Sequence, residues 1–155
     1  MRIKVITTEF NSIDFANGWR NANDVGHALA VFEIMGQHLK NPQIKAALFW
    51  NTRWITNTTS PQNIDDALDK NSNMNANGLA LSIWGNNLLQ KLINATSTGT
   101  GTNFIKVFSD YDDIRNTLNI FLINKDNINR PIKLNIPNYF SNPFYQRYQY
   151  NSSIG

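Results

Sequence analysis

The run IKAALFW occupies residues 44–50. Its short, nearly continuous apolar character is typical of a β-strand that is buried on both faces. Upstream, residues 2–8 (RIKVITT) alternate and are rich in Ile, Val and Thr, which predicts another strand. A helical pattern separates the two runs. Because a strand–helix–strand unit joins parallel strands, we expect a right-handed crossover here.

The helix between these strands is predicted from apolar residues spaced three and four apart. Asn23 or Asp24 can cap its start, and the Asn41-Pro42 pair ends it after Lys40. Further apolar residues lie off this stripe, so we expect the helix to be covered on more than one face. The stripe consists of Val25, Ala28, Leu29, Phe32, Met35 and Leu39.

The character of the sequence changes near TSTGTG, residues 96–101. Before it, a polar segment at residues 51–77 leads into a second helical pattern at residues 79–93. After it, strand-like runs are separated by turn residues, which favours an antiparallel layer. We therefore predict one unit at residues 1–98 and a β-rich unit at residues 99–155. The runs are residues 104–109, 117–124, 132–137 and 144–150.

Composition narrows the class of protein. The chain has 155 residues, 41% of them hydrophobic and 16% charged, which indicates a globular protein rather than a disordered one. The net charge of +3 is spread along the chain, so nucleic-acid binding receives little support. No apolar stretch is long enough to cross a membrane, and Met1 is followed directly by the strand pattern rather than by a signal peptide.

The sequence predicts no metal and no cofactor. There are no cysteines, and His27 and His38 are too far apart along their helix to share a metal ion. The aspartates at residues 110–113 lack the glycine and the terminal glutamate of a calcium loop. TSTGTG is followed by no lysine, so it does not match a phosphate-binding loop.

Glu9 is the leading candidate for a catalytic residue. It follows the first predicted strand directly, and parallel β-α folds place their chemistry at the carboxyl ends of strands. Trp50 and Asn51 follow the second strand, so all three side chains are expected at one edge. A structural role for Glu9, such as pairing with a lysine, explains its position equally well. The candidate substrate-binding residues are Trp50, Asn11, Asn51, Arg53 and Trp54.

Glycoside hydrolysis would give this arrangement a purpose. A retaining enzyme uses two carboxyl groups about 5–5.5 Å apart, one as nucleophile and the other as acid and base. Aromatic side chains stack on sugar rings, while amide and guanidinium groups bind hydroxyls. The chain has a single further glutamate, Glu33, which lies on the first helix and would point away from the strand ends. An aspartate could take this role, but Asp14, in the loop beside Glu9, is a poor candidate for a positioned acid. The acid/base residue is therefore expected to be missing from this chain.

Four segments together resemble the end of a (β/α)8 glycoside hydrolase of clan A, of the α-L-arabinofuranosidase type (family 51 and relatives). They are VITTEFNS, ANDVGHALAVFEIMGQHLKN, IKAALFWNTRWI and GLALSIWGNNLLQKLI, and the order of elements is more specific than any one motif. The resemblance implies the last two β-α units of a barrel followed by part of an antiparallel β-sandwich. It also implies that Glu9, in the string Glu9-Phe10-Asn11, is the nucleophile and that Trp50 lies near the sugar.

The resemblance implies a fragment of a retaining enzyme that acts on plant or algal polysaccharides or oligosaccharides. Its partners would be the carbohydrate and the N-terminal portion of the same protein, and the parent would be extracellular or periplasmic. The isolated chain would be inactive and marginally stable. Two alternatives remain open: a non-catalytic carbohydrate-binding module that uses Trp54, Tyr139 and Tyr145, or a small structural α+β protein.

Overall fold

The computed structural model describes residues 3–12, 23–53, 65–99, 101–137 and 145–150. Within these ranges there are two helices and five strands, which form two separate small sheets. None of the described helices is long and apolar enough to span a membrane. The elements are β1 (Val5–Phe10), α1 (Val25–Lys40), β2 (Ile44–Phe49), α2 (Ala76–Asn87), β3 (Lys91–Ile93), β4 (Ile105–Asp112) and β5 (Thr117–Asn124).

The first sheet is the parallel pair β1–β2, which confirms the predicted strand–helix–strand unit. Val5 pairs with Ile44 at one end and Phe10 with Phe49 at the other. The first strand extends to Phe10, two residues beyond its predicted end, so Glu9 belongs to the strand. Helix α1 begins where expected, because the Asp24 side chain accepts a hydrogen bond from the backbone N–H of His27 at its first turn.

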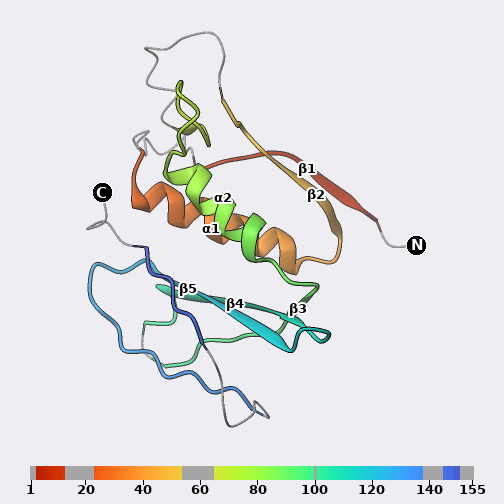
Figure 1. Cartoon of the computed structure of the whole chain (residues 1–155), viewed down its shortest axis with the longest axis vertical. Coiled ribbons are helices and arrows are strands. Elements are labelled where there is room, and N and C mark those ends of the chain that lie inside the picture. The colour runs from red at the N-terminus through yellow and green to blue at the C-terminus, as the bar shows by residue number, and fades with distance from the viewer. Residues whose placement is uncertain (1–2, 13–22, 54–64, 100, 138–144, 151–155) are drawn as a thin grey trace.

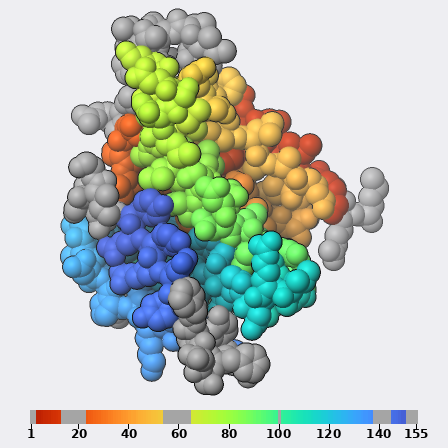
Figure 2. All heavy atoms as spheres, in the orientation of Figure 1, coloured from red at the N-terminus to blue at the C-terminus, as the bar shows by residue number. Residues whose placement is uncertain are grey.

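The second sheet is the antiparallel triple β3–β4–β5. Figure 1 shows α1 and α2 lying between the two sheets, with β1–β2 on one side and β3–β5 on the other. In the space-filling view the surface of α2 separates the surfaces that belong to the two sheets (Figure 2). The helices therefore form a middle layer that each sheet covers from one side.

The predicted fold class is wrong: the chain is not the last two β-α units of a barrel followed by a β-sandwich. The described residues form one parallel pair and one antiparallel triple, and no second sheet packs on the triple. Residues 132–137 and 145–150, in runs predicted as strands, adopt no regular structure, and all of them except Ile136 are exposed. Local β pattern without a partner strand or a covered face does not make a strand.

The second helix is shorter than predicted. It ends at Asn87 rather than residue 93, and Leu88 is already extended with φ −63° and ψ 124°. The backbone N–H of Leu89 donates to the buried Asp110 carboxylate at 3.0 Å, and residues 91–93 pair with β4 as β3. Tertiary contacts with β4 thus override the helical periodicity of this segment.

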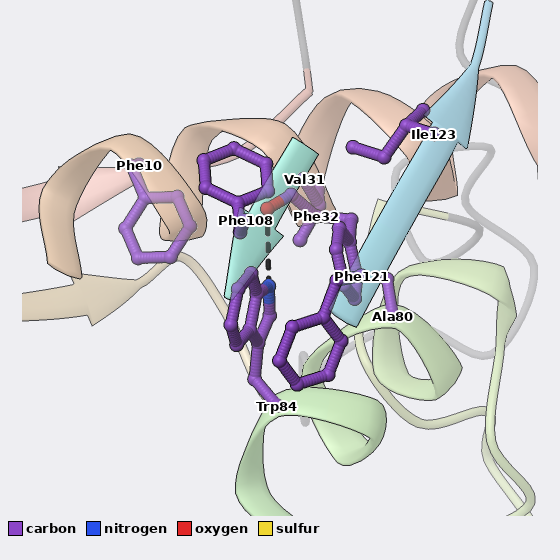
Figure 3. Close-up of a cluster of buried hydrophobic side chains, with 8 residues drawn as sticks. All are labelled: Phe10, Val31, Phe32, Ala80, Trp84, Phe108, Phe121 and Ile123. Carbon is purple, nitrogen blue, oxygen red and sulfur yellow. Dashed lines mark hydrogen bonds between the residues drawn. The ribbon is translucent and has the colours of Figure 1, made fainter. Parts of the chain in front are cut away.

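The core lies between the helices and the antiparallel sheet, with one contribution from β1. Trp84 of α2 stacks on Phe32 of α1 with ring centroids 4.6 Å apart, and its Nε1–H donates to the Phe32 carbonyl at 3.1 Å (Figure 3). Residues from both predicted units share this cluster, while the boundary at residue 98 stays a prediction. Its members are Phe10, Val31, Phe32, Ala80, Trp84, Phe108, Phe121 and Ile123.

Candidate functional site

The carboxyl ends of β1 and β2 bring Glu9 and Trp50 to one edge of the parallel pair. The Trp50 N–H donates to the Phe10 carbonyl at 2.9 Å, which fixes the two strand ends side by side. Phe10 is buried, whereas Glu9 is exposed and Trp50 is 45% exposed. Glu9 lies in the stretch between Thr7 and Phe10 where the pairing of β1 with β2 is irregular, and its side chain is open to solvent.

A polar hub lies directly beside these strand ends. The Nδ2 group of Asn11, the residue after β1, donates both to the Trp50 carbonyl and to the Asp65 carbonyl, the latter at 3.1 Å. The Asn11 Oδ1 accepts from the Ser12 N–H at 2.6 Å. This one amide therefore ties the end of β1 to the end of β2 and to the segment at residues 65–69.

Asn77, in the first turn of α2, is the last member of the hub. Its Nδ2 lies 2.9 Å from the Asp65 carbonyl, 3.2 Å from the Asn11 Oδ1 and 3.4 Å from the Ser12 Oγ. Asn77 is 1% exposed, so these bonds form away from water. We define the hub as Asn11, Ser12, Asp65 and Asn77.

Asp65 is the unusual member of the hub. It is 1% exposed, and no donor in the described part of the chain reaches either carboxyl oxygen. Burial raises the pKa of the Asp65 carboxyl above its ordinary value; the charge of His27 opposes this rise, whereas Asp66 and Asp24 add to it. A charged carboxylate is therefore disfavoured at this position.

Two ionisable side chains at the start of α1, those of Asp24 and His27, lie near Asp65. The His27 ring is 1% exposed, and its Nδ1 lies 2.9 Å from the Asp24 Oδ1. The same Asp24 oxygen accepts the His27 backbone N–H at 3.0 Å. The start of α1 is thus an acidic cap with a buried imidazole, which places ionisable groups on two elements around the hub.

The predicted substrate-binding residues differ in their surroundings. Trp50 is exposed at the strand end, with a cis peptide bond between it and Asn51. Asn11 is occupied by the hub, and the Asn51 carbonyl accepts from the Ala67 N–H at 3.0 Å. Arg53 is exposed and donates to the Ser72 Oγ at 3.0 Å. Trp54 lies outside the described residues.

Glu33, the second glutamate of the chain, is paired with two lysines. On α1 it accepts a hydrogen bond from Lys125 at 2.5 Å, and it lies 3.8 Å from the Nζ of Lys106. Lys106 lies in β4 and Lys125 directly follows β5, so Glu33 links α1 to the antiparallel sheet. No set of three or more histidine or acidic side chains in the described ranges is arranged to hold a metal ion.

Sequence reasoning did not find Asp65, Asn77 or His27 as members of the site. Asp65 and Asn77 are brought to the strand ends by contacts with Asn11, which lies 54 and 66 residues away along the chain. The sequence carries no signal for them, because the burial of Asp65 and Asn77 is a property of the folded chain.

Comparisons with protein-family models, with curated proteins and with solved structures give no match to this chain.

Proposed function

We propose that the edge formed by the ends of β1 and β2 is the saccharide site of a retaining glycoside hydrolase. Glu9 is the nucleophile and Trp50 is the platform on which a sugar ring stacks. The observation that carries the proposal is the position of an exposed carboxylate and an exposed indole at adjacent ends of parallel strands. The resemblance seen in the sequence supplies the reaction type.

In this reaction a carboxylate oxygen of Glu9 attacks the anomeric carbon as the bond to the leaving oxygen breaks. The leaving oxygen takes a proton from the acid/base group. That group then removes a proton from water, which attacks the glycosyl ester and releases Glu9. Trp50 contributes by stacking, which desolvates the sugar and holds the anomeric carbon near the carboxylate.

The acid/base group is not assigned to a described residue. Glu33 is held by lysines at the opposite side of α1, and Asp65 is buried under the edge rather than open to a substrate. The proposal therefore requires a further polypeptide segment that brings a carboxyl group to the exposed face. Ile6 and Leu48, 59% and 55% exposed on the same pair of strands, favour such a covering segment, because parallel sheets are normally covered on both faces.

A binding experiment tests the position of the site. The chain is titrated with oligosaccharides derived from arabinan, xylan, agarose and cellulose while backbone and indole resonances are followed by NMR. We expect one class to shift the resonances of Trp50 and Glu9, Trp50→Ala to abolish binding, and Glu9→Gln to retain it. Binding that survives in Trp50→Ala, or an absence of shifts at this edge with every class, contradicts the proposal.

A non-catalytic carbohydrate-binding role is the second candidate. The exposed aromatic residues near the C-terminus favour it, since Tyr145 and Tyr148 are 82% and 73% exposed. In that case the saccharide would shift the resonances of these tyrosines instead of those of Trp50. Substituting both tyrosines by serine separates the two candidates, because it would abolish binding in the second case only.

A further inference from the structure

The side chain of Asp65 is almost completely buried, at 1% exposed. Both of its carboxyl oxygens lack a donor among the residues that the structure describes. The amide oxygens of Asn51 and Asn77 are buried too and likewise find no donor in the described ranges. A buried carboxyl group that receives no hydrogen bond favours its protonated form, because an unpaired charge is costly to bury.

The backbone of the same residue holds the strand ends together. The Asp65 carbonyl accepts from Asn11 at 3.1 Å and from Asn77 at 2.9 Å. Asn11 in turn donates to the Trp50 carbonyl. Two residues after Asp65, the Ala67 N–H donates to the Asn51 carbonyl at 3.0 Å. A backbone movement that carries the Asp65 carbonyl away from Asn11 and Asn77 would break the bonds that fix the ends of β1 and β2.

We propose that Asp65 is a positioning residue that stays uncharged in the folded protein and that its ionisation releases the ends of β1 and β2, which makes the edge bearing Glu9 and Trp50 pH-sensitive. The release itself is a property of the described residues. Its effect on a saccharide rests on the proposed function of that edge.

The direction of the pH effect follows from the chemistry of the group. A carboxylic acid whose pKa is raised by burial stabilises the closed arrangement fully below its ordinary pKa, and that stabilisation is lost as the pH rises through the raised value. The ionisable groups that act on Asp65 are His27 and Asp24 of α1 and Asp66 of its own segment.

Amide hydrogen exchange measures this release at single residues. Protection factors are compared at about pH 4 and about pH 8, each corrected for the intrinsic exchange rate, in constant salt with a chelator present. In the unaltered chain we expect protection of the Trp50 and Ala67 amides to fall at least several-fold over this range. Protection of the β4–β5 ladder, represented by Phe108 and Phe121, should change much less.

Asp65→Asn is the decisive variant, since it replaces the acid by an uncharged side chain of the same size and leaves His27 in place. We expect it to keep the Trp50 and Ala67 amides protected at both pH values. Asp110→Asn is the matched control: Asp110 is also a buried carboxyl with a pKa raised by burial, but it lies in β4 and accepts from Leu89. This control should leave the pH dependence at Trp50 unchanged.

Equal pH dependence at Trp50 in the unaltered chain and in Asp65→Asn would overturn the proposal. If Asp65→Asn does not fold, the carboxyl carbon of Asp65 is titrated by NMR in the unaltered chain. A midpoint at or below the ordinary value for aspartate, about 3.9, would overturn it equally. Neither readout uses a saccharide, so the pH-dependent release can be confirmed or refuted whether or not the edge binds a saccharide.

Discussion

Replacing Trp84 by Phe tests whether one core joins the helices to the antiparallel sheet. Trp84 is 2% exposed, and its ring centroid lies 4.4 Å from that of Phe121 and 5.6 Å from that of Phe108. The substitution removes the Nε1–H bond to Phe32, which is worth about 1 kcal/mol. Loss of the second ring leaves a cavity that costs roughly a further 1–2 kcal/mol, since complete truncation of such residues costs about 3–5 kcal/mol.

We therefore expect Trp84→Phe to lower the free energy of unfolding by about 2–3 kcal/mol. Domains of this size have about 5–15 kcal/mol in total, so the loss is a large fraction. Urea unfolding followed by far-ultraviolet circular dichroism measures it, and the midpoint should fall by about 1 M at a typical slope of roughly 2 kcal/mol per M. The transition should stay single, because Trp84 contacts α1, β4 and β5 at once.

Trp50→Phe is the control for this substitution. It makes the same chemical change at a side chain that is 45% exposed, so we expect a change within about 0.5 kcal/mol. Equal destabilisation by the two substitutions would refute the reasoning. Two separate transitions, with only the one that includes the helices shifted in Trp84→Phe, would show that the sheet is not stabilised through this residue.

Substitutions at three further positions test the packing and the capping of the helices. Gly36→Ala would place a Cβ 2.6 Å from the Phe108 ring, and we expect a loss of about 1–3 kcal/mol in thermal unfolding. Gly85→Ala meets no atom within 4 Å and should gain up to about 1 kcal/mol; equal effects at the two glycines would contradict this packing. Asp24→Ala removes the acceptor of the His27 N–H and should cost about 1 kcal/mol, whereas Asp24→Asn should retain most of the cap; if the alanine variant is as stable as the asparagine variant, the cap contributes nothing.

The parallel unit could be predicted because its signals are local. Each signal involves residues that are close together in the sequence: the apolar run of β2, the spacing of apolar residues in α1, and the capping residue Asp24 beside the first turn of that helix. The end of α2 could not, since Leu89 leaves the helical path to bond Asp110, a residue 21 positions away. Periodicity indicates which face a segment can bury, but it does not show which distant residue will bond to the end of the segment.

The predicted sandwich failed for a related reason. Residues 117–124 became a strand because β4 lies beside them, whereas residues 132–137 have a similar alternation and no partner strand among the described residues. Strand formation depends on cross-strand pairs and burial more than on the intrinsic preference of the residues.

The candidate site was predicted in part. Glu9 and Trp50 come to one edge because parallel strands end together, which sequence order alone implies. The hub beneath them was not foreseen. Asp65 and Asn77 act mainly through a carbonyl oxygen and a buried amide, and neither kind of contact leaves a signature in one sequence.

Covalent labelling tests whether Glu9 is the nucleophile of a glycoside hydrolase. The chain is incubated with 2-deoxy-2-fluoroglycosides of arabinofuranose, xylose, glucose and galactose that carry a dinitrophenolate leaving group. Such a leaving group needs no protonation, so a nucleophile without its acid/base partner is sufficient, and the fluorine slows hydrolysis of the glycosyl ester. Intact-mass and peptide mass spectrometry should find one adduct, on Glu9, and none in Glu9→Gln. An adduct on another residue, or no adduct with any of these sugars, would contradict the account.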